Sequence, residues 1–159
     1  MRRVALVFRA VAFDAEPAAS LADAMRSEMA ALYDGLDIDD PSMPKAGAAE
    51  LGPPGGRFLV GFDADGRGVC CGGLKRLTGS ACEIKRMYVV PDARGSGVGG
   101  ELLGALEEAA RELGYRLIRL DTGPRQPHAE RMYRQAGYRP IDNFNANPMA
   151  SFFGEKPLA

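Results

Sequence analysis

The apolar residues of this chain recur at two spacings, one typical of strands and the other typical of helices. Runs rich in β-branched and aromatic residues predict strands at residues 4–13, 57–63, 68–77, 81–90, 115–122, 138–144 and 149–157. Apolar residues three and four positions apart predict helices at residues 20–33 and 98–113, and Pro127 and Gly137 mark the ends of a third helix at residues 127–137. The resulting order, β-α-βββ-α-β-α-ββ, predicts a single α+β domain over residues 1–159 with a mixed sheet.

Capping and turn residues mark the ends of these elements. Ser20 is a candidate N-cap of the first helix, and Gly114 and Gly137 follow the other two helices, where glycine commonly ends a helix. The pair Asp65-Gly66 predicts a hairpin turn. Residues 34–56 contain four prolines and five glycines and predict a long loop. A loop of this length inside a compact domain is usually functional or mobile.

Composition narrows the class of protein. The chain is 46% hydrophobic and 26% charged with a net charge of -1, so nothing suggests nucleic acid or an anionic membrane as a partner. No apolar run approaches the roughly 20 residues that cross a bilayer. Arg9 and Asp14 interrupt the segment that would otherwise look like a signal peptide. We therefore expect a cytoplasmic protein.

Cysteine and histidine are too few for a disulfide framework or a zinc site. Cys70, Cys71 and Cys82 are an odd number, no C-x-x-C occurs, and the chain has one histidine. All three cysteines fall in predicted strands, where small buried apolar side chains are common. The sequence predicts no metal.

The stretch RGSGVGG, residues 94–100, allows two interpretations. Read from Gly95, it matches the G-x-G-x-x-G fingerprint of dinucleotide-binding folds, and Asp121 follows at a spacing suited to a ribose contact. However, residues 91–94 separate the preceding strand from the first glycine, and only 38 residues follow Asp121. Further parallel β-α units would not fit there. A dinucleotide-dependent oxidoreductase is therefore the weaker alternative.

Read from Arg94, the same stretch is R-x-x-G-x-G. Glycines at the start of a helix let a phosphate approach the backbone N–H groups, because no Cβ stands in the way. The helix dipole also favours an anion at this end, and Arg94 adds a positive charge. Four glycines in six positions exceed what a turn alone requires. The sequence predicts a pyrophosphate site without identifying the cofactor.

A longer segment makes the interpretation specific. The stretch EIKRMYVVPDARGSGVGGELLGALEEAARELGYRLIRLDT, followed by AERMYRQAGYRP, resembles the GNAT superfamily of acetyl-CoA-dependent N-acetyltransferases. In that family an R/Q-x-x-G-x-G/A loop binds the pyrophosphate of coenzyme A. A later A-x-x-x-Y-x-x-x-G-F pattern is matched by Ala129, Tyr133, Gly137 and Tyr138. The resemblance implies a mostly antiparallel sheet of six to seven strands flanked by helices.

The resemblance also implies an acetyl transfer to a primary amine and assigns roles to residues. Coenzyme contacts are expected at Tyr88, Val89, Val90, Arg94, Gly95, Ser96, Gly97, Val98, Gly99 and Gly100. Val89 is expected to offer the backbone N–H that stabilises the carbonyl oxygen. Glu83 matches a general-base position, acting through a water, and Tyr133 matches the general acid that protonates the leaving thiolate. By residue type alone, Glu83 could equally face solvent and Tyr133 could be a packing residue.

The acceptor is expected between the first helix, the loop after it and the loop before the last strand. The candidate residues in these segments are Tyr33, Asp37, Asp39, Asn143 and Phe144. Four aspartates in seven positions, residues 34–40, predict either a solvated loop or a negative mouth for a small cationic molecule, such as a polyamine, an aminoglycoside or a basic amino acid. A non-catalytic acyl-CoA-binding or sensing domain is the main alternative. Homodimers are common in the resembled family, so a homodimer is a further expectation.

Overall fold

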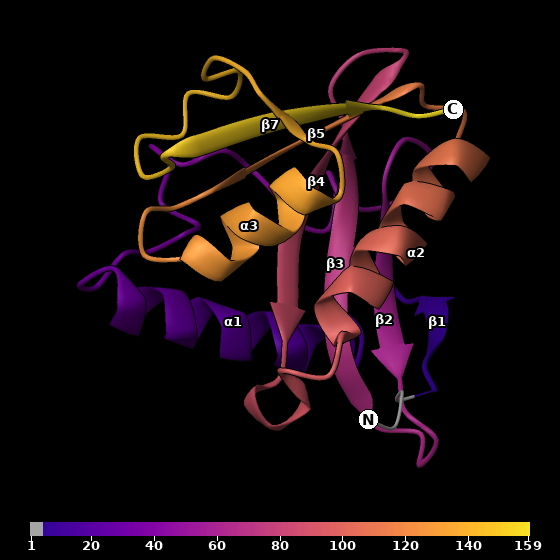
Figure 1. The fold of residues 1–159 in the computed structure, drawn as a ribbon. Coiled ribbons are helices and arrows are strands. Elements are labelled where there is room, and N and C mark those ends of the chain that lie inside the picture. Colours follow the sequence, from indigo (N-terminus) through magenta and orange to yellow (C-terminus); the bar gives the residue numbers. More distant parts are fainter. Residues whose placement is uncertain (1–4) are drawn as a thin grey trace.

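Seven strands form one mixed sheet in the computed structural model, which describes residues 5–159 (Figure 1). The strands are β1 (Val7–Ala10), β2 (Arg57–Phe62), β3 (Gly68–Arg76), β4 (Ala81–Val89), β5 (Leu117–Thr122), β6 (Arg139–Pro140) and β7 (Phe152–Pro157). The helices are α1 (Ala18–Leu32), α2 (Val98–Glu112) and α3 (Pro127–Gln135), with a 3-10 turn, η1, at Pro91–Ala93. The predicted α+β class and the predicted order of elements are confirmed.

The sheet is antiparallel apart from one pair of strands. Its order is β1-β2-β3-β4-β5-β7-β6, and only β4 and β5 run parallel to each other. Parallel neighbours need a crossover connection, and α2 supplies it. Dinucleotide-binding folds have a mostly parallel sheet, so this topology excludes the dinucleotide interpretation of the glycine loop.

Helices cover both faces of the sheet. In Figure 1, α2 and α3 lie in front of the sheet and α1 lies behind it. The neighbouring glycines of β3 allow close packing on both faces. A Cβ on Gly72 would lie 2.8 Å from Leu106 of α2, and one on Gly73 would lie 2.9 Å from Leu51 and Phe58. Helix α2 and the long loop therefore pack directly on the backbone of β3.

The long loop between α1 and β2 is anchored to the sheet. Leu51 is 1% exposed, and Ile38 and Ala46 are also buried. Lys75 donates a hydrogen bond from Nζ to the Lys45 carbonyl at 2.7 Å. The segment that the sequence predicts as functional or mobile thus forms part of the layer on the α1 side of the sheet.

The three cysteines are buried and free, as the sequence predicts. Burial raises the pKa of the Cys70 thiol to about 11 and that of the Cys71 thiol to about 12. The thiols therefore remain protonated and pack as small apolar side chains.

Several element boundaries differ from the predictions. Helix α1 begins at Ala18, and Ser20 is not its N-cap; the Ser20 N–H and hydroxyl both donate to Glu16. The strand predicted at residues 138–144 is reduced to β6, because the Asn143 side chain accepts from the N–H groups of Asn145 and Ala146 and turns the chain. The first strand is also shorter than predicted, and residue 4 lies outside the described residues.

The parallel pair of strands separates soon after it begins. β4 pairs with β5 only over Ala81–Glu83, opposite Leu117–Arg119. Arg86 then adopts a φ of 60° beside a break in the β3–β4 register, which is the geometry of a β-bulge. Beyond this bulge the two strands diverge, and the candidate site lies around the opening. No helix within residues 5–159 combines the length and the apolar character needed to cross a membrane.

Candidate active site

The glycine loop, residues 94–100, leads from η1 into α2. Gly95 and Gly97 have φ values of 84° and 87°, a region that residues with a Cβ adopt only with strain. Gly97 is also the N-cap of α2. Gly97, the first glycine of R-x-x-G-x-G, and Gly95, which occupies an x position of that motif, are thus required by the backbone conformation itself.

The N–H groups of this loop are available to a ligand. Within residues 5–159, no backbone carbonyl accepts a hydrogen bond from the N–H groups of residues 95–100. A Cβ built on Gly95, Gly97 or Gly100 would meet no atom within 4 Å, so the surface above these residues is open. With the positive end of the α2 dipole behind it, the loop fits the phosphates of a coenzyme.

Arg94 is held at the start of the loop by three contacts. Its Nε donates to the Val89 carbonyl at 2.9 Å, and its Nη2 donates to Glu28 Oε2 at 2.7 Å. Its guanidinium lies 5.5 Å from the centre of the Tyr88 ring. The Arg94 side chain is 44% exposed, and exposed ion pairs are weak. A phosphate could therefore compete with Glu28 for this guanidinium.

The end of β4 presents a backbone donor to the opening. The Val90 N–H donates to the Val69 carbonyl at 2.9 Å, on the β3 side. Successive N–H groups of a strand point to opposite edges, so the Val89 N–H points to the edge from which β5 has separated. Val89 thus has the orientation expected of a donor to a carbonyl oxygen.

A cavity of about 120 Å³ lies between α1 and its following loop, β4, the end of β5 with the start of α3, and the loop before β7. Its lining residues are Met25, Met29, Tyr33, Leu36, Ile38, Met43, Pro44, Ile84, Lys85, Arg86, Met87, Asp121, Thr122, Gly123, Gln126, Tyr133, Asn147, Met149 and Ala150. None of residues 94–100 lines this cavity. The predicted coenzyme loop and the cavity are therefore two distinct parts of the candidate site.

Tyr133 reaches the cavity from α3. Its side chain is buried, and its hydroxyl donates to the sulfur of Met87 at 3.4 Å. Burial raises the pKa of the Tyr133 hydroxyl above its ordinary value, and the negative charge of Asp121 raises it further. The phenol therefore stays protonated at neutral pH, as a general acid must before it acts.

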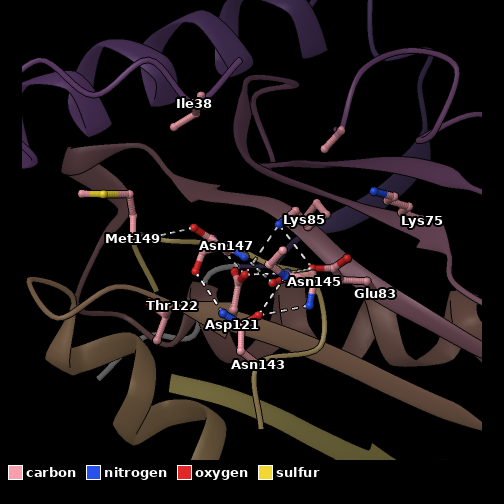
Figure 2. A network of polar contacts seen from close by, with 12 residues as sticks. Ile38, Lys75, Glu83, Lys85, Asp121, Thr122, Asn143, Asn145, Asn147 and Met149 are labelled. Atoms are coloured by element: carbon pink, nitrogen blue, oxygen red, sulfur yellow. Dashed lines mark hydrogen bonds and ion pairs between the residues drawn. The ribbon is translucent and has the colours of Figure 1, made fainter. Parts of the chain in front are cut away.

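A polar network lies at the side of the cavity formed by β4 and β5. Figure 2 shows Lys85, Asn145 and Asn147 turned toward Asp121. The Asn145 amide donates to both Glu83 Oε2 and Asp121 Oδ2, each at 2.7 Å, and the Asn147 amide donates to Asp121 Oδ2 at 2.9 Å. Lys85 Nζ lies 3.2 Å from Glu83 and 3.8 Å from Asp121. The Lys85 ammonium and the Asn145 amide thus connect the two carboxylates, whereas the Asn147 amide contacts Asp121 alone.

Glu83, the base expected from the sequence, lies behind this network. It is fully buried and does not line the cavity. Its Oε1 is buried with no hydrogen-bond partner within residues 5–159. Burial raises the pKa of Glu83 and the Asp121 charge adds to the rise, while Lys85 and Asn145 act in the opposite direction. Any proton that Glu83 takes from a molecule in the cavity must pass through its neighbours.

Of the residues predicted to meet the acceptor, Tyr33 lines the cavity. Its hydroxyl donates to Gln126 at 3.2 Å and accepts from the Arg125 N–H at 3.3 Å, which ties α1 to the segment before α3. A Cβ on Gly123 would collide with the Tyr33 ring, so glycine is needed there.

The other four predicted acceptor residues do not line the cavity. Asp39 forms ion pairs with Arg26 at 2.7 Å and with Arg86 at 3.2 Å. Asp37 accepts a hydrogen bond from the Asp39 N–H. Asn143 forms the turn described above, and Phe144 packs against Phe153 with ring centres 6.1 Å apart.

Sequence reasoning did not assign Lys85, Asp121 or Asn147 to the amine site. Lys85 and Asp121 each had a signal: Lys85 alternates with Glu83 along one strand and so shares its face, and Asp121 lies near the end of the adjacent strand. Asn147 had none. It belongs, with Asn145, to an irregular loop whose path depends on the Asn143 turn.

Comparison with known proteins identifies the family. The model of the acetyltransferase (GNAT) family matches residues 21–138, so the chain belongs to this family and is an acyltransferase. The resemblance seen in the sequence is thereby confirmed. The seven-stranded sheet also matches a GNAT-family acetyltransferase from Staphylococcus aureus, with a TM-score of 0.78 over 98% of this chain and 100% of the other, at 19% identity.

Relatives in sequence carry several different names. An "IAA acetyltransferase" of Azospirillum brasilense is 38% identical over 112 residues, 68% of this chain and 72% of the relative. The uncharacterized N-acetyltransferase YjgM of Escherichia coli is 31% identical over 111 residues, 68% of this chain and 65% of the relative. An aminoalkylphosphonate N-acetyltransferase of Salmonella typhimurium is 39% identical over 57 residues, 36% of this chain and 37% of the relative.

Proposed function

We propose that this protein transfers an acetyl group from acetyl-CoA to the primary amine of a small molecule. One observation carries the proposal: an open glycine loop at a helix N-terminus and a cavity containing a buried tyrosine lie around the separation of β4 and β5. The loop suits the phosphates of a coenzyme, and the cavity is a separate space for a second reactant. Membership of the GNAT family supports acetyl-CoA as the donor.

When bound, acetyl-CoA supplies an activated acyl group, and this chain supplies its binding and orientation. The free N–H groups of residues 95–100, with Arg94, would hold the phosphates. The Val89 N–H would donate to the carbonyl oxygen as negative charge develops on it. A backbone donor of this kind is fixed before the reaction and needs no reorganisation.

Tyr133 would act as the general acid. Its raised pKa keeps the proton on the phenol, and its hydroxyl has one hydrogen bond, to a sulfur that accepts only weakly. The Met87 sulfur competes only weakly for this proton, so the hydroxyl is free to turn toward a leaving thiolate.

Glu83 would contribute to proton removal only indirectly, because it does not line the cavity. Its carboxylate is linked to that of Asp121 through Lys85 and Asn145. A role for Glu83 in proton removal therefore depends on Asp121, which lines the cavity.

The acidic loop after α1 gives limited support for a polycationic acceptor. Asp39 is neutralised by Arg26 and Arg86, and Asp40 accepts hydrogen bonds from Ser42. A cytoplasmic location and a homodimer remain predictions from the sequence.

The test is release of the coenzyme thiol from acetyl-CoA in the presence of a panel of primary amines, combined with calorimetry of acetyl-CoA binding. Amine-dependent thiol release with matching formation of the N-acetyl product is the expected result. Binding of acetyl-CoA without thiol release for any amine would favour a sensing domain. Failure to bind acetyl-CoA would contradict the proposal as a whole.

A further inference from the structure

Asp121 is the one acidic side chain among the cavity-lining residues that the structure describes. It is the penultimate residue of β5, on the side of the opening opposite the Val89 edge of β4. Its side chain is 11% exposed, whereas that of Glu83 is not exposed at all. A cation in this cavity therefore meets the carboxylate of Asp121 and not that of Glu83.

The two oxygens of Asp121 have different roles in the network. Both amide donors, from Asn145 and Asn147, and the ammonium of Lys85 approach Oδ2. No hydrogen bond or ion pair within residues 5–159 involves Oδ1. Oδ2 thus fixes the carboxylate in place, and Oδ1 remains available to a ligand.

The positive charges nearby are already shared with other groups. Lys85 lies closer to Glu83 than to Asp121, at 3.2 against 3.8 Å. Arg86 also lines the cavity, but its guanidinium pairs with Asp39 and points to the carbonyls of Ile38 and Ala46. Neither cation is therefore paired with Asp121 alone, and a cationic ligand can pair with its free oxygen.

We propose that Asp121 binds the acceptor ammonium through Oδ1 and removes one of its protons, while Glu83 and Lys85 act behind it as positioning residues. The assignment rests on the proposed function. It replaces the role that the family resemblance implies for Glu83, that of a general base acting through a water. Glu83 instead shares Lys85 and Asn145 with Asp121 and so fixes the position and charge of that carboxylate.

The protons and bonds balance as follows. The acceptor R–NH3⁺ gives one proton to the Asp121 carboxylate and becomes a neutral amine with a free electron pair. That pair forms the new N–C bond as the thioester C–S bond breaks. The nitrogen loses a second proton to solvent, and Tyr133 gives its proton to the leaving sulfur and regains one from solvent. The products are an N-acetyl amine, the free thiol and one proton in solution, released when Asp121 is deprotonated again.

The test compares Asp121→Asn with Asp142→Asn, an exposed aspartate in the loop before β7. With 2-phenylethylamine as acceptor, kcat/KM for the amine should fall at least about hundredfold in Asp121→Asn, the range of a lost general base. The acetyl-CoA dissociation constant should change less than about twofold, since Asp121 is not part of the glycine loop. Asp142→Asn should match the wild type.

Two further variants make the outcome decisive. Asp121→Ser removes the carboxylate in a smaller side chain and must meet the same criterion if Asp121→Asn does not fold. Glu83→Gln should lower kcat/KM by less than about tenfold, because it keeps the cavity-facing carboxylate. An Asp121 variant within about tenfold of wild type, or a Glu83→Gln loss as large as that of Asp121→Asn, would overturn the assignment. An inactive wild-type enzyme would instead overturn the proposed function.

A different observation bears on the body of the acceptor. Five of the seven methionines of the chain line the cavity: Met25, Met29, Met43, Met87 and Met149. They come from α1, the loop after it, β4 and the loop before β7. Methionine side chains are apolar and flexible, and together they form surfaces that adapt to apolar ligands. Leu36 and Ile38 extend this surface.

We infer that the acceptor is a monoamine with an apolar body, such as an aryl or branched alkyl group, whose amine lies at Asp121. A polyamine would place a second ammonium against the methionines, where no carboxylate is available to pair with it. Burying such a charge without a partner is costly. This inference also rests on the proposed function, and it concerns substrate class alone.

The experiment measures kcat/KM for 2-phenylethylamine and for spermidine with the wild-type enzyme. We expect 2-phenylethylamine to be preferred at least about tenfold, the effect of leaving one charge unpaired. Met149→Gln should reduce kcat/KM for 2-phenylethylamine at least about threefold, and by more than Met149→Leu, which keeps an apolar side chain. Equal or better turnover of spermidine would overturn the inference while leaving the acetyltransferase function intact.

Discussion

The hydroxyl of Tyr133 makes few contacts, so removing it should affect catalysis far more than it affects the stability of the fold. Its hydrogen bond goes to the Met87 sulfur at 3.4 Å, and a thioether is a weak acceptor. Replacing Tyr133 by Phe should therefore cost no more than an ordinary hydrogen bond, about 1 kcal/mol. For a domain of this size that corresponds to a Tm decrease of at most about 4 °C. The ring and its packing against Tyr138 would remain.

Loss of a general acid has a much larger effect on rate. General acid–base catalysis contributes about 10²- to 10⁴-fold, so we expect kcat of Tyr133→Phe to fall at least about hundredfold. The dissociation constant of acetyl-CoA should stay within about twofold, since Tyr133 does not belong to the glycine loop. Thiol release at saturating substrates, calorimetry of acetyl-CoA binding and thermal unfolding measure the three quantities on one preparation.

Tyr138→Phe is the matched control. Tyr138 is also buried but does not line the cavity, and its hydroxyl donates to Glu107 at 2.8 Å. Its removal should reduce stability by about 1–3 kcal/mol with little effect on kcat. The assignment of Tyr133 would be refuted by a kcat within about threefold of wild type. A large loss of Tm together with lost acetyl-CoA binding would refute it equally, because Tyr133 would then be a packing residue.

Three further predictions concern the coenzyme loop and the buried carboxylate. Arg94→Ala should weaken acetyl-CoA binding about tenfold in calorimetry with little change in Tm, since its ion pair with Glu28 is exposed; unchanged affinity would remove Arg94 from the site. Gly100→Ala should increase the free energy of unfolding by up to about 1 kcal/mol, as alanine favours helix, yet weaken acetyl-CoA binding by covering the open loop; equal affinity would show that the loop is not the phosphate site. Burial raises the pKa of Glu83, so folding favours its protonated form, and the stability that it contributes declines as the pH rises above about 4.5. In urea unfolding, wild type should therefore lose stability relative to Glu83→Gln between pH 5 and pH 8, and a pH-independent difference would contradict this.

Most of the fold was accessible from local sequence patterns. The apolar spacing of α2 and the strand composition of β2, β3 and β4 predicted these elements because each buries one continuous face or run. Helix α3, in which Tyr133 is the buried residue, was predicted from Pro127 and Gly137 at its ends. The loop before β7 was mispredicted in part. There the Asn143 side chain accepts from two backbone N–H groups and ends the strand early, a local competition that hydrophobic patterning does not register.

The candidate site also has some residues that the local sequence identifies and some features that depend on packing. Gly95 and Gly97 were identifiable because a left-handed backbone conformation demands glycine within a short stretch of chain. Glu83 was identifiable as a carboxylate on the strand before the loop, but its complete burial was not. Whether a side chain on a strand meets a cavity depends on what packs over it, and here Lys85, Asn145 and Asp121 lie between Glu83 and the cavity.

The sequence by itself determined the order of elements, the glycine loop at the start of α2 and the tyrosine of α3, because each is encoded within a few neighbouring residues. The tertiary structure alone decided which carboxylate faces the cavity and that methionines from four segments form its wall. These features depend on contacts between residues far apart in the chain, such as Asn145 with Glu83 and Asp121. Burial and charge at a site are properties of that assembled neighbourhood, and no local pattern records them.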